Sequence, residues 1–160
     1  YNGNLRVFLG SSTKKRNTLR FKKDLNKEKK MIKHIKTFQK KVNNWKIKKK
    51  NYLIKLTKKF GPLPAKAFPG RASILIHLLQ LNNKIISAIY EKDFSLKVNK
   101  YVPGTNIKIL KEKYFTKKER DKGSIINLAW HISSEIKFYL KNKMKYKGKI
   151  IDIISNKDFQ

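Results

Sequence analysis

The sequence contains no cysteine, which excludes disulfide frameworks, thiolate metal sites and cysteine nucleophiles and favours a cytoplasmic location. Histidine is scarce too, and His34, His77 and His131 are too scattered to form a convincing metal site. Long apolar runs are missing. The longest, Ile74 to Leu79, is interrupted by His77 and is far shorter than the roughly 20 residues that cross a bilayer. We therefore expect no metal site and no membrane span.

The start of the sequence lacks the features of a complete gene product. Residues 1–4 (Tyr-Asn-Gly-Asn) show neither an initiator methionine nor the basic-then-apolar order of a signal peptide. The 160 residues suffice for one medium domain, or for one domain with a fragment of a neighbour. We expect the chain to begin inside a longer protein.

Acidic residues are few: 10 Asp and Glu face 41 Lys and Arg, a net charge of +31. Such a balance is typical of polyanion-binding proteins, so a lysine-rich nucleic-acid-binding (ribosomal-type) protein is the alternative hypothesis. However, nearly all of this charge is lysine, whereas recognition of bases and phosphates favours the bidentate arginine fork. We favour a solvated lysine surface, which should show little affinity for polyanions at physiological ionic strength, and keep non-specific polyanion binding as an open alternative.

The first half of the chain predicts a short strand and then a long helix. Leu5 to Leu9 is a short apolar run followed by a Gly-Ser-Ser-Thr loop. From about Leu19 to Phe60, apolar residues recur every three or four positions among lysines, which indicates a narrow apolar stripe on a helix, broken or bent near Asn43-Asn44. The stripe consists of Met31, Ile32, Ile35, Phe38, Val42, Trp45, Leu53, Leu56 and Phe60. Gly61-Pro62 must end this helix.

The second half alternates between strand and helix patterns, which favours an α/β fold: a Rossmann-like parallel sheet flanked by helices and preceded by the long lysine-rich helix. Right-handed crossovers predict about four main strands in the spatial order second, first, third, fourth. The expected strands are 63–68, 85–90, 124–130 and 149–154, with a further short strand at 107–110. The expected helices are 70–81 and 133–146, the second capped by Ser133.

In such a sheet, ligands bind beyond the carboxyl ends of the strands. We expect three candidate elements there. Gly70, Arg71 and Ser73 lie where the first strand passes into its helix and suit a diphosphate. Thr105 closes the turn Val102-Pro103-Gly104-Thr105, which has the composition of a type II turn.

The third candidate is His131, which follows the strand that ends near Ala129. An imidazole at this edge is useful to a ligand site, although a lone histidine is more often structural. His77, within the apolar helix, is interpreted as packed. We find no catalytic triad, no supported pair of carboxylates and no metal-ligand spacing, so we assign no catalytic, cofactor-binding or metal-ligating residue.

Several of these elements, taken in order, resemble the C-terminal region of the sugar C-methyltransferase family. They are Gly3-Asn4-Leu5-Arg6-Val7-Phe8, Pro69-Gly70-Arg71-Ala72-Ser73, Lys100-Tyr101-Val102-Pro103-Gly104-Thr105-Asn106-Ile107, and Leu128-Ala129-Trp130-His131-Ile132 with Glu135-Ile136. The resemblance extends from the first residue to about Ile154. It implies a Rossmann-like domain that helps bind a nucleotide diphosphate sugar.

The resemblance also implies how the chain is organised. Residues 1–16 would be the last strand of a truncated SAM-binding domain, 17–60 a connecting helix, and 61–160 the Rossmann-like C-terminal domain. S-adenosylmethionine would be the cofactor of the parent enzyme, bound by an upstream domain, and this chain would hold no cofactor. The family's zinc cysteines and its acid/base tyrosine and histidine have no counterpart here, so the isolated chain is expected to be inactive.

One departure from the family bears on the substrate site. The family's Gly-x-Gly-Ala element is replaced here by Ala65-Lys66-Ala67-Phe68, with Pro62 and Pro64 nearby. The bulkier side chains of Ala67 and Phe68 should restrict backbone approach to a phosphate. A degenerate domain without a ligand is therefore a third hypothesis. The sequence does not specify the sugar, the carbon, the nucleotide or the oligomeric state.

Overall fold

The structure is a computed structural model that describes residues 18–121 and 123–159. The described residues form two units, divided between residues 39 and 40. The 43-residue helix α1 (Thr18–Phe60) contributes to both units. Within the first unit, the side chains of Met31, Ile35 and Phe38 are exposed, at 70%, 56% and 61%. In this unit, the described side chains of the predicted apolar stripe are therefore exposed.

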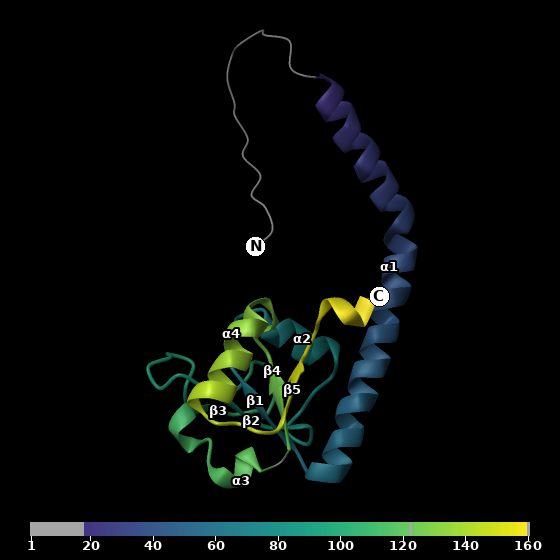
Figure 1. Ribbon diagram of the computed structural model, residues 1–160. Helices are drawn as coiled ribbons and strands as arrows, with labels where there is room; N and C mark the ends of the chain where they lie inside the picture. The colour runs from purple at the N-terminus through teal and green to yellow at the C-terminus, as the bar shows by residue number, and fades with distance from the viewer. Residues whose placement is uncertain (1–17, 122, 160) are drawn as a thin grey trace. The chain divides into compact units, whose positions relative to one another are not determined.

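The second unit contains a parallel sheet of five strands in the order β3-β2-β1-β4-β5 (Figure 1). The strands are β1 (Leu63–Lys66), β2 (Ile86–Glu91), β3 (Ile109–Lys111), β4 (Ser124–Asn127) and β5 (Lys149–Asp152). The predicted order of the four main strands is confirmed, and β3 adds an edge strand beside β2. The expected strand Leu5 to Leu9 lies outside the described residues.

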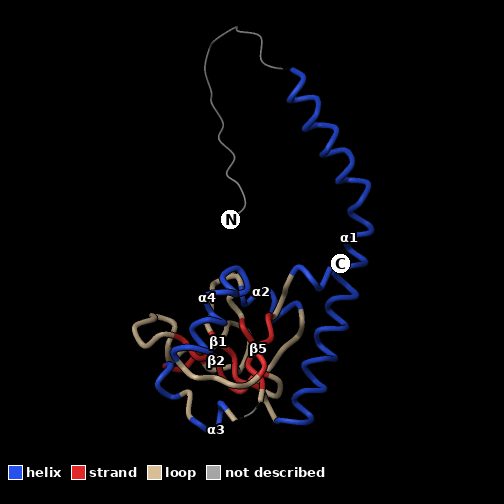
Figure 2. The backbone as a smooth tube through the Cα atoms, in the orientation of Figure 1, coloured by secondary structure: helices blue, strands red, loops and turns tan. Residues whose placement is uncertain are grey.

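Helices cover both faces of the sheet, as the tube in Figure 2 shows. On one face, Trp45 and Leu53 of α1 and Ile76 of α2 (Ala72–Leu78) pack with buried residues of the strands. On the other face, Leu140 packs with Tyr146, Phe115 and residues of β2 and β4. Leu140 belongs to a π-helical segment (Tyr139–Lys143) that continues α4 (Ser133–Phe138). The Rossmann-like α/β architecture is thus confirmed.

The second part of α1 is attached to the sheet and to the C-terminal segment. Trp45 is 3% exposed, and its ring centroid lies 5.9 Å from that of Phe159 in the last 3-10 helix (Asn156–Phe159). Lys49 forms an ion pair with Asp158 at 3.0 Å. The helix ends where the sequence predicts: Gly61 has a φ of +72° and its N–H donates to the Thr57 carbonyl oxygen at 2.9 Å. Residues 40–60 therefore share a core with the sheet.

Some local predictions are wrong. The helix α1 shows no break at Asn43 and Asn44, because asparagine lowers helix propensity only slightly and Trp45 is held by tertiary packing; of the predicted break or bend, only the break is excluded. The helix after β1 is shorter than expected, since a turn occupies 70–71 and α2 ends at Leu78. Ser133 does not cap α4; its hydroxyl donates instead to Asp152 at 2.8 Å.

Pro64 lies in the central strand β1, where a proline is unusual because it cannot donate a ladder hydrogen bond. The register explains how it is accommodated. Leu63 pairs with Ile86 and Ala65 with Ile89, so that β2 advances three residues while β1 advances two. The irregularity falls at Pro64 and resembles a bulge, where a missing donor is tolerated.

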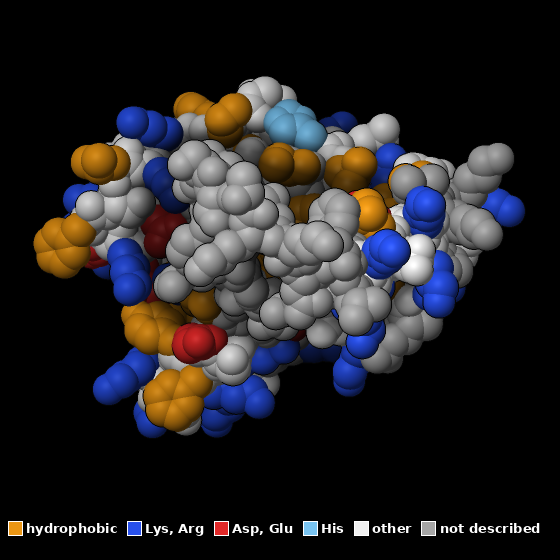
Figure 3. All heavy atoms as spheres, turned by 90° about the horizontal axis from the view of Figure 1, so that it is seen from above, with side chains coloured by type: hydrophobic (Ala, Val, Ile, Leu, Met, Phe, Trp, Pro, Cys, Tyr) orange, Lys and Arg blue, Asp and Glu red, His pale blue; other side chains and the backbone are white. Residues whose placement is uncertain are grey.

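Lysine dominates the surface of the chain. The space-filling view in Figure 3 shows blue Lys and Arg side chains around the visible face and only a few acidic ones. Among the described residues, no helix is both long enough and apolar enough to cross a membrane.

Candidate ligand site at the carboxyl edge of the sheet

The site follows from the sheet topology. The chain moves outward from β1 to β2 and β3, and then returns to the other side of β1 to form β4 and β5. The winding direction therefore reverses between β1 and β4, and parallel α/β sheets bind ligands at such a point, beyond the carboxyl ends of the strands. The loops that follow β1 and β4 are joined there by a hydrogen bond from the Leu128 N–H to the Lys66 carbonyl oxygen at 3.1 Å.

The loop after β1 makes a sharp turn at Ala67, whose φ of +62° lies in the left-handed region. A residue with a Cβ is strained there by roughly 1–2 kcal/mol, whereas glycine is not. The resemblance noted from the sequence places the second glycine of the Gly-x-Gly-Ala element at this residue. The backbone at Ala67 therefore has a conformation that favours glycine although the residue is alanine.

Gly70, Arg71 and Ser73 lie together beyond this turn. Gly70 has no positive φ, and a Cβ added to it would meet no atom within 4 Å, so the fold itself does not require glycine there. Arg71 is exposed and occupies the position before α2. The Ser73 hydroxyl donates to the Gly70 carbonyl oxygen at 2.9 Å. The structure thus brings these three predicted residues to one end of α2.

The loop after β4 presents His131 at the same edge. The buried side chain of Asn127 ends the strand and accepts a hydrogen bond from the Ala129 N–H at 3.0 Å, which holds the start of the loop. His131 is exposed in a 3-10 helix (Trp130–Ile132) and packs edge-on against Trp130, with ring centroids 5.6 Å apart. Because β1 and β4 are adjacent, His131 and the Gly70 loop leave neighbouring strands at the same edge.

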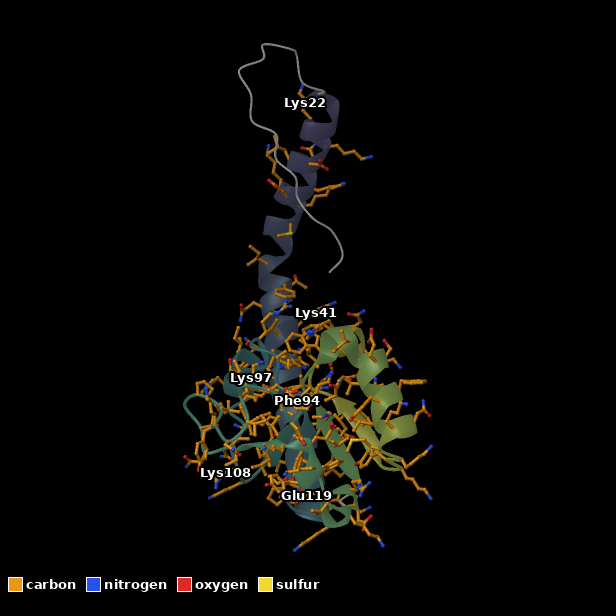
Figure 4. The ribbon with its side chains drawn as sticks, turned by 90° about the vertical axis from the view of Figure 1, so that its left-hand side faces the viewer. Lys22, Lys41, Phe94, Lys97, Lys108 and Glu119 are labelled. Carbon is orange, nitrogen blue, oxygen red and sulfur yellow. The ribbon has the colours of Figure 1, made fainter. Side chains whose placement is uncertain are left out.

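The loop after β2 is tied to the loop after β1. The Phe68 N–H donates to the Glu91 carboxylate at 2.7 Å, and Lys97 Nζ donates to the Phe68 carbonyl oxygen at 2.7 Å. Phe94, on the same loop as Lys97, is 99% exposed (Figure 4). An aromatic ring in this position offers a face on which a planar group can stack.

A buried ion pair lies beneath this edge. Lys66, the last residue of β1, pairs with Glu112, whose other carboxylate oxygen accepts a hydrogen bond from the Tyr139 hydroxyl at 2.7 Å. The side chains of Lys66 and Glu112 are only 4% and 17% exposed. The hydrogen bond to Glu112, with burial second, raises the pKa of Tyr139 to about 12. These groups hold the ends of β1 and β3 against the π-helical segment.

A second buried network surrounds Asp152 at the end of β5. Its carboxylate accepts hydrogen bonds from Asn127 at 2.8 Å, Ser133 at 2.8 Å and Lys137 at 2.5 Å. Burial by itself raises the pKa of Asp152, but these three hydrogen bonds outweigh it and lower the pKa below its ordinary value of 3.8. The ionised carboxylate therefore joins β4, β5 and α4 at the candidate site.

The structure does not bring Thr105 to this edge. The turn at 102–105 forms as predicted: the Thr105 N–H donates to the Val102 carbonyl oxygen at 3.0 Å, and Gly104 has a φ of +69°. However, this turn packs on the far end of α2, where His77 Nε2 lies 2.7 Å from the Pro103 carbonyl oxygen. Thr105 lines a cavity of about 660 Å³ there, together with His77.

This placement also corrects the interpretation of His77. The side chain is exposed rather than packed, and it anchors the turn through Pro103. Gly70 and His77 are seven positions apart in the sequence, about 10 Å at helical rise. Thr105 is thus separated from the group formed by Gly70, Arg71, Ser73 and His131.

Sequence reasoning missed Lys66, Glu112, Tyr139 and Asp152. A signal was present for two of them, since Lys66 and Asp152 are charged residues that end β1 and β5 directly after apolar residues. Charged side chains in such positions are rarely buried unless they are paired. Within residues 18–121 and 123–159, no group of three or more metal-ligating side chains is placed to hold a metal ion.

Comparison with known families bears directly on this geometry. Residues 1–154 match the family described as the C-methyltransferase C-terminal domain. The chain belongs to this family. Searches of curated proteins and of solved structures give no significant match. A C-methyltransferase C-terminal domain implies methyl transfer by its parent protein, and the matched range includes Gly70, Arg71, Ser73 and His131.

Proposed function

We propose that this C-methyltransferase C-terminal domain binds the nucleotide diphosphate sugar substrate of a SAM-dependent C-methyltransferase. The observation that supports the proposal is the family match together with the reversal point of the sheet, because the loops that carry Gly70, Arg71, Ser73 and His131 follow the adjacent strands β1 and β4. The methyl donor and the acid/base residues are assigned to another part of the parent enzyme. Residues 1–16 are proposed as the last strand of that SAM-binding domain, 17–60 as the connecting helix and 61–160 as the substrate domain.

The proposed roles follow from the chemistry of the ligand. A diphosphate needs cationic and N–H donors, which Arg71 and the backbone around Gly70 provide. The open space at Gly70 lets a phosphate approach the backbone closely. His131 on the neighbouring loop is proposed to contact the sugar, and Phe94 is proposed to offer a ring on which the base stacks. Thr105, at the other end of α2, is left out of the proposed group.

Calorimetric titration with UDP-, GDP- and dTDP-glucose, at fixed ionic strength, tests this proposal. Charge-assisted hydrogen bonds to phosphate contribute roughly 1.5–3 kcal/mol each, so Arg71→Ala should weaken binding about tenfold or more. Lys48→Ala is the matched control, because Lys48 is an exposed cation on α1. Equal, small effects of the two substitutions would reject the nucleotide-sugar site and leave only the fold and the family.

Two further titrations separate this function from the alternatives. The isolated chain should bind no SAM, and measurable SAM binding would show that the donor site has been misassigned. Inorganic polyphosphate should bind more weakly than a nucleotide sugar and should lose affinity steeply with salt, because exposed lysines act through counterion release. A preference for polyphosphate, equally sensitive to Arg71→Ala and Lys48→Ala, would favour a generic polyanion surface.

A further inference from the structure

Glu91 ends β2 at the carboxyl edge of the sheet, beside the turn that follows β1. Lys66 pairs with Tyr90 in the parallel register of these strands, so Glu91 comes level with that turn. The Glu91 side chain is half-buried, and its carboxylate accepts the Phe68 N–H at 2.7 Å through Oε2 and the Lys92 N–H at 3.0 Å through Oε1. Two backbone donors thus hold the carboxylate at the candidate ligand edge.

These two contacts do not exhaust the carboxylate of Glu91. An ionised carboxylate has about four acceptor positions and no donor, and the backbone N–H groups take one position on each oxygen. Glu91 can therefore accept further hydrogen bonds. The ligand group that suits it is one that carries its own donors and no negative charge.

The N–H of Phe68 determines which part of a nucleotide can lie beside Glu91. In α/β sheets the free N–H groups of the turn after the first strand commonly receive a phosphate. Here the carboxylate already occupies the Phe68 N–H, and Pro69 has no N–H. A phosphate oxygen in this place would meet a like charge and no donor, whereas a hydroxyl can donate to the carboxylate. The diphosphate is therefore displaced toward Gly70 and Arg71, and a hydroxylated part of the ligand belongs beside Glu91.

The position of Glu91 along the chain agrees with a role toward the pentose. In dinucleotide-binding sheets, an acidic residue about 20 positions after the phosphate-binding turn accepts hydrogen bonds from the ribose. Glu91 ends the second strand, 23 positions after Phe68. Phe94 follows on the same loop and is 99% exposed. Because the pentose links the base to the phosphates, a base stacked on Phe94 would bring its pentose next to Glu91.

The loop after β2 is held in this arrangement by its own hydrogen bonds. The Ser95 N–H donates to the Lys92 carbonyl oxygen at 3.0 Å, and the Val98 N–H donates to the Ser95 carbonyl oxygen at 3.1 Å. Lys97 Nζ fastens the loop to the Phe68 carbonyl oxygen at 2.7 Å. A loop that is ordered before binding loses little conformational freedom when a ligand arrives.

We propose that Glu91 binds the pentose hydroxyls of the nucleotide and thereby sets the direction in which the ligand lies across the sheet. This assignment rests on the proposed function. The base and pentose lie over the loop after β2, the diphosphate reaches Gly70 and Arg71 beyond β1, and the sugar extends to His131 beyond β4. Because β2, β1 and β4 are consecutive in the sheet, three neighbouring loops meet the parts of the ligand in their chemical order.

Calorimetry with the full chain compares UDP-, GDP- and dTDP-glucose, each with its 2′,3′-dideoxy analogue, which lacks every free pentose hydroxyl. The unaltered protein should prefer the natural form of the nucleotide that binds most tightly by about tenfold or more, because the analogue loses a hydrogen bond to a charged group. Glu91→Gln keeps the size of the side chain and an acceptor oxygen for the Phe68 N–H, but it removes the charge. In this variant the preference should fall to about threefold or less.

Asp93→Asn is the matched control, because Asp93 is an exposed carboxylate on the same loop that lines the cavity around Tyr139 and Glu112. It removes the same charge and should leave the preference unchanged. Inorganic diphosphate is a second probe. Since diphosphate has no pentose, Glu91→Gln should bind it no more weakly than the unaltered protein does.

The outcomes separate this assignment from the proposed function. Equal affinities of the unaltered chain for a nucleotide sugar and its dideoxy analogue would overturn the role of Glu91 and leave the proposed function standing. A preference that is undiminished in Glu91→Gln would also overturn it. Parallel losses in Glu91→Gln for the nucleotide sugar, the analogue and diphosphate would identify a purely structural role and overturn it as well. If none of the three nucleotide sugars binds, the proposed function and this assignment are both rejected.

Discussion

Removing the carboxylate of Glu112 should destabilise the domain strongly, because it isolates a buried ammonium group. The side chain of Lys66 is 4% exposed and its ion-pair partner Glu112 is 17% exposed. Breaking a buried ion pair by deleting one partner typically costs about 3–5 kcal/mol. The Tyr139 hydroxyl also loses its acceptor, but partial exposure of Glu112 lets water compensate. We therefore expect Glu112→Leu to lower the free energy of unfolding by about 3 kcal/mol.

The double variant Lys66→Met with Glu112→Leu should recover most of that loss. Replacing both members of a buried pair by apolar residues of similar volume is often neutral or stabilising, since no charge then has to be desolvated. Lys66→Met alone leaves a carboxylate that is closer to solvent, so its cost should be smaller than that of Glu112→Leu. The three variants form a cycle that separates the coupling between the two side chains from their individual effects.

Urea unfolding at pH 7, followed by circular dichroism and by the fluorescence of the buried Trp45, measures these differences. Asp24→Asn is the control, because the Asp24–Lys27 pair is exposed, at 57% and 70%. It should change the unfolding free energy by less than about 1 kcal/mol. A loss below about 1 kcal/mol in Glu112→Leu, or a double variant no more stable than Glu112→Leu, would refute the view that Lys66 depends on this partner.

Three further predictions concern single residues. Ala67→Gly should raise the free energy of unfolding by about 0.5–1 kcal/mol, because relief of the strain at the left-handed φ exceeds the added conformational freedom of the unfolded chain. A lower unfolding free energy of this variant in urea would contradict the left-handed conformation at Ala67. The pKa of Asp152 is lowered in the folded state, so its ionised carboxylate contributes stability above pH 3.8, and this contribution is lost at lower pH. In Asp152→Asn the free energy of unfolding should therefore fall less on acidification. An acid transition identical to that of the unaltered protein would contradict this prediction. Burial and then Glu119 raise the pKa of Tyr90 to about 12, so stability should fall as pH rises from 10 toward 12, less so in Tyr90→Phe; identical alkaline profiles would contradict this.

The sequence predicted the parts of the fold that depend on local signals and general topology rules. The alternation of strand and helix patterns, with right-handed crossovers, was sufficient for the order of the four main strands. Gly61-Pro62 and Pro103-Gly104 marked a helix end and a turn that the structure confirms. Each of these features is decided within a few residues of the chain, or by handedness.

What could not be predicted depends on contacts between distant segments. Lys66 and Glu112 are 46 positions apart, and no local pattern shows that they meet. That Thr105 lies beside the C-terminal end of α2 could not be predicted, because its position depends on the antiparallel bridge between Tyr101 and Lys108, which turns the chain back before β3. Periodicity identified the face of α1 that carries Met31 but could not tell whether anything covers it.

The proline in the central strand has a consequence for folding specificity. A slip of one residue would move every β1 side chain to the opposite face of the sheet, separating Lys66 from Glu112. The same slip would shift Pro64, which has no N–H, into a place where the neighbouring strand needs a donor. Because β1 is bordered by both β2 and β4, a shifted β1 would change its hydrogen-bond pairing with both strands. Pro64 and Lys66 therefore disfavour other registers of β1, because the observed register accommodates the missing N–H of Pro64 and keeps the Lys66–Glu112 ion pair.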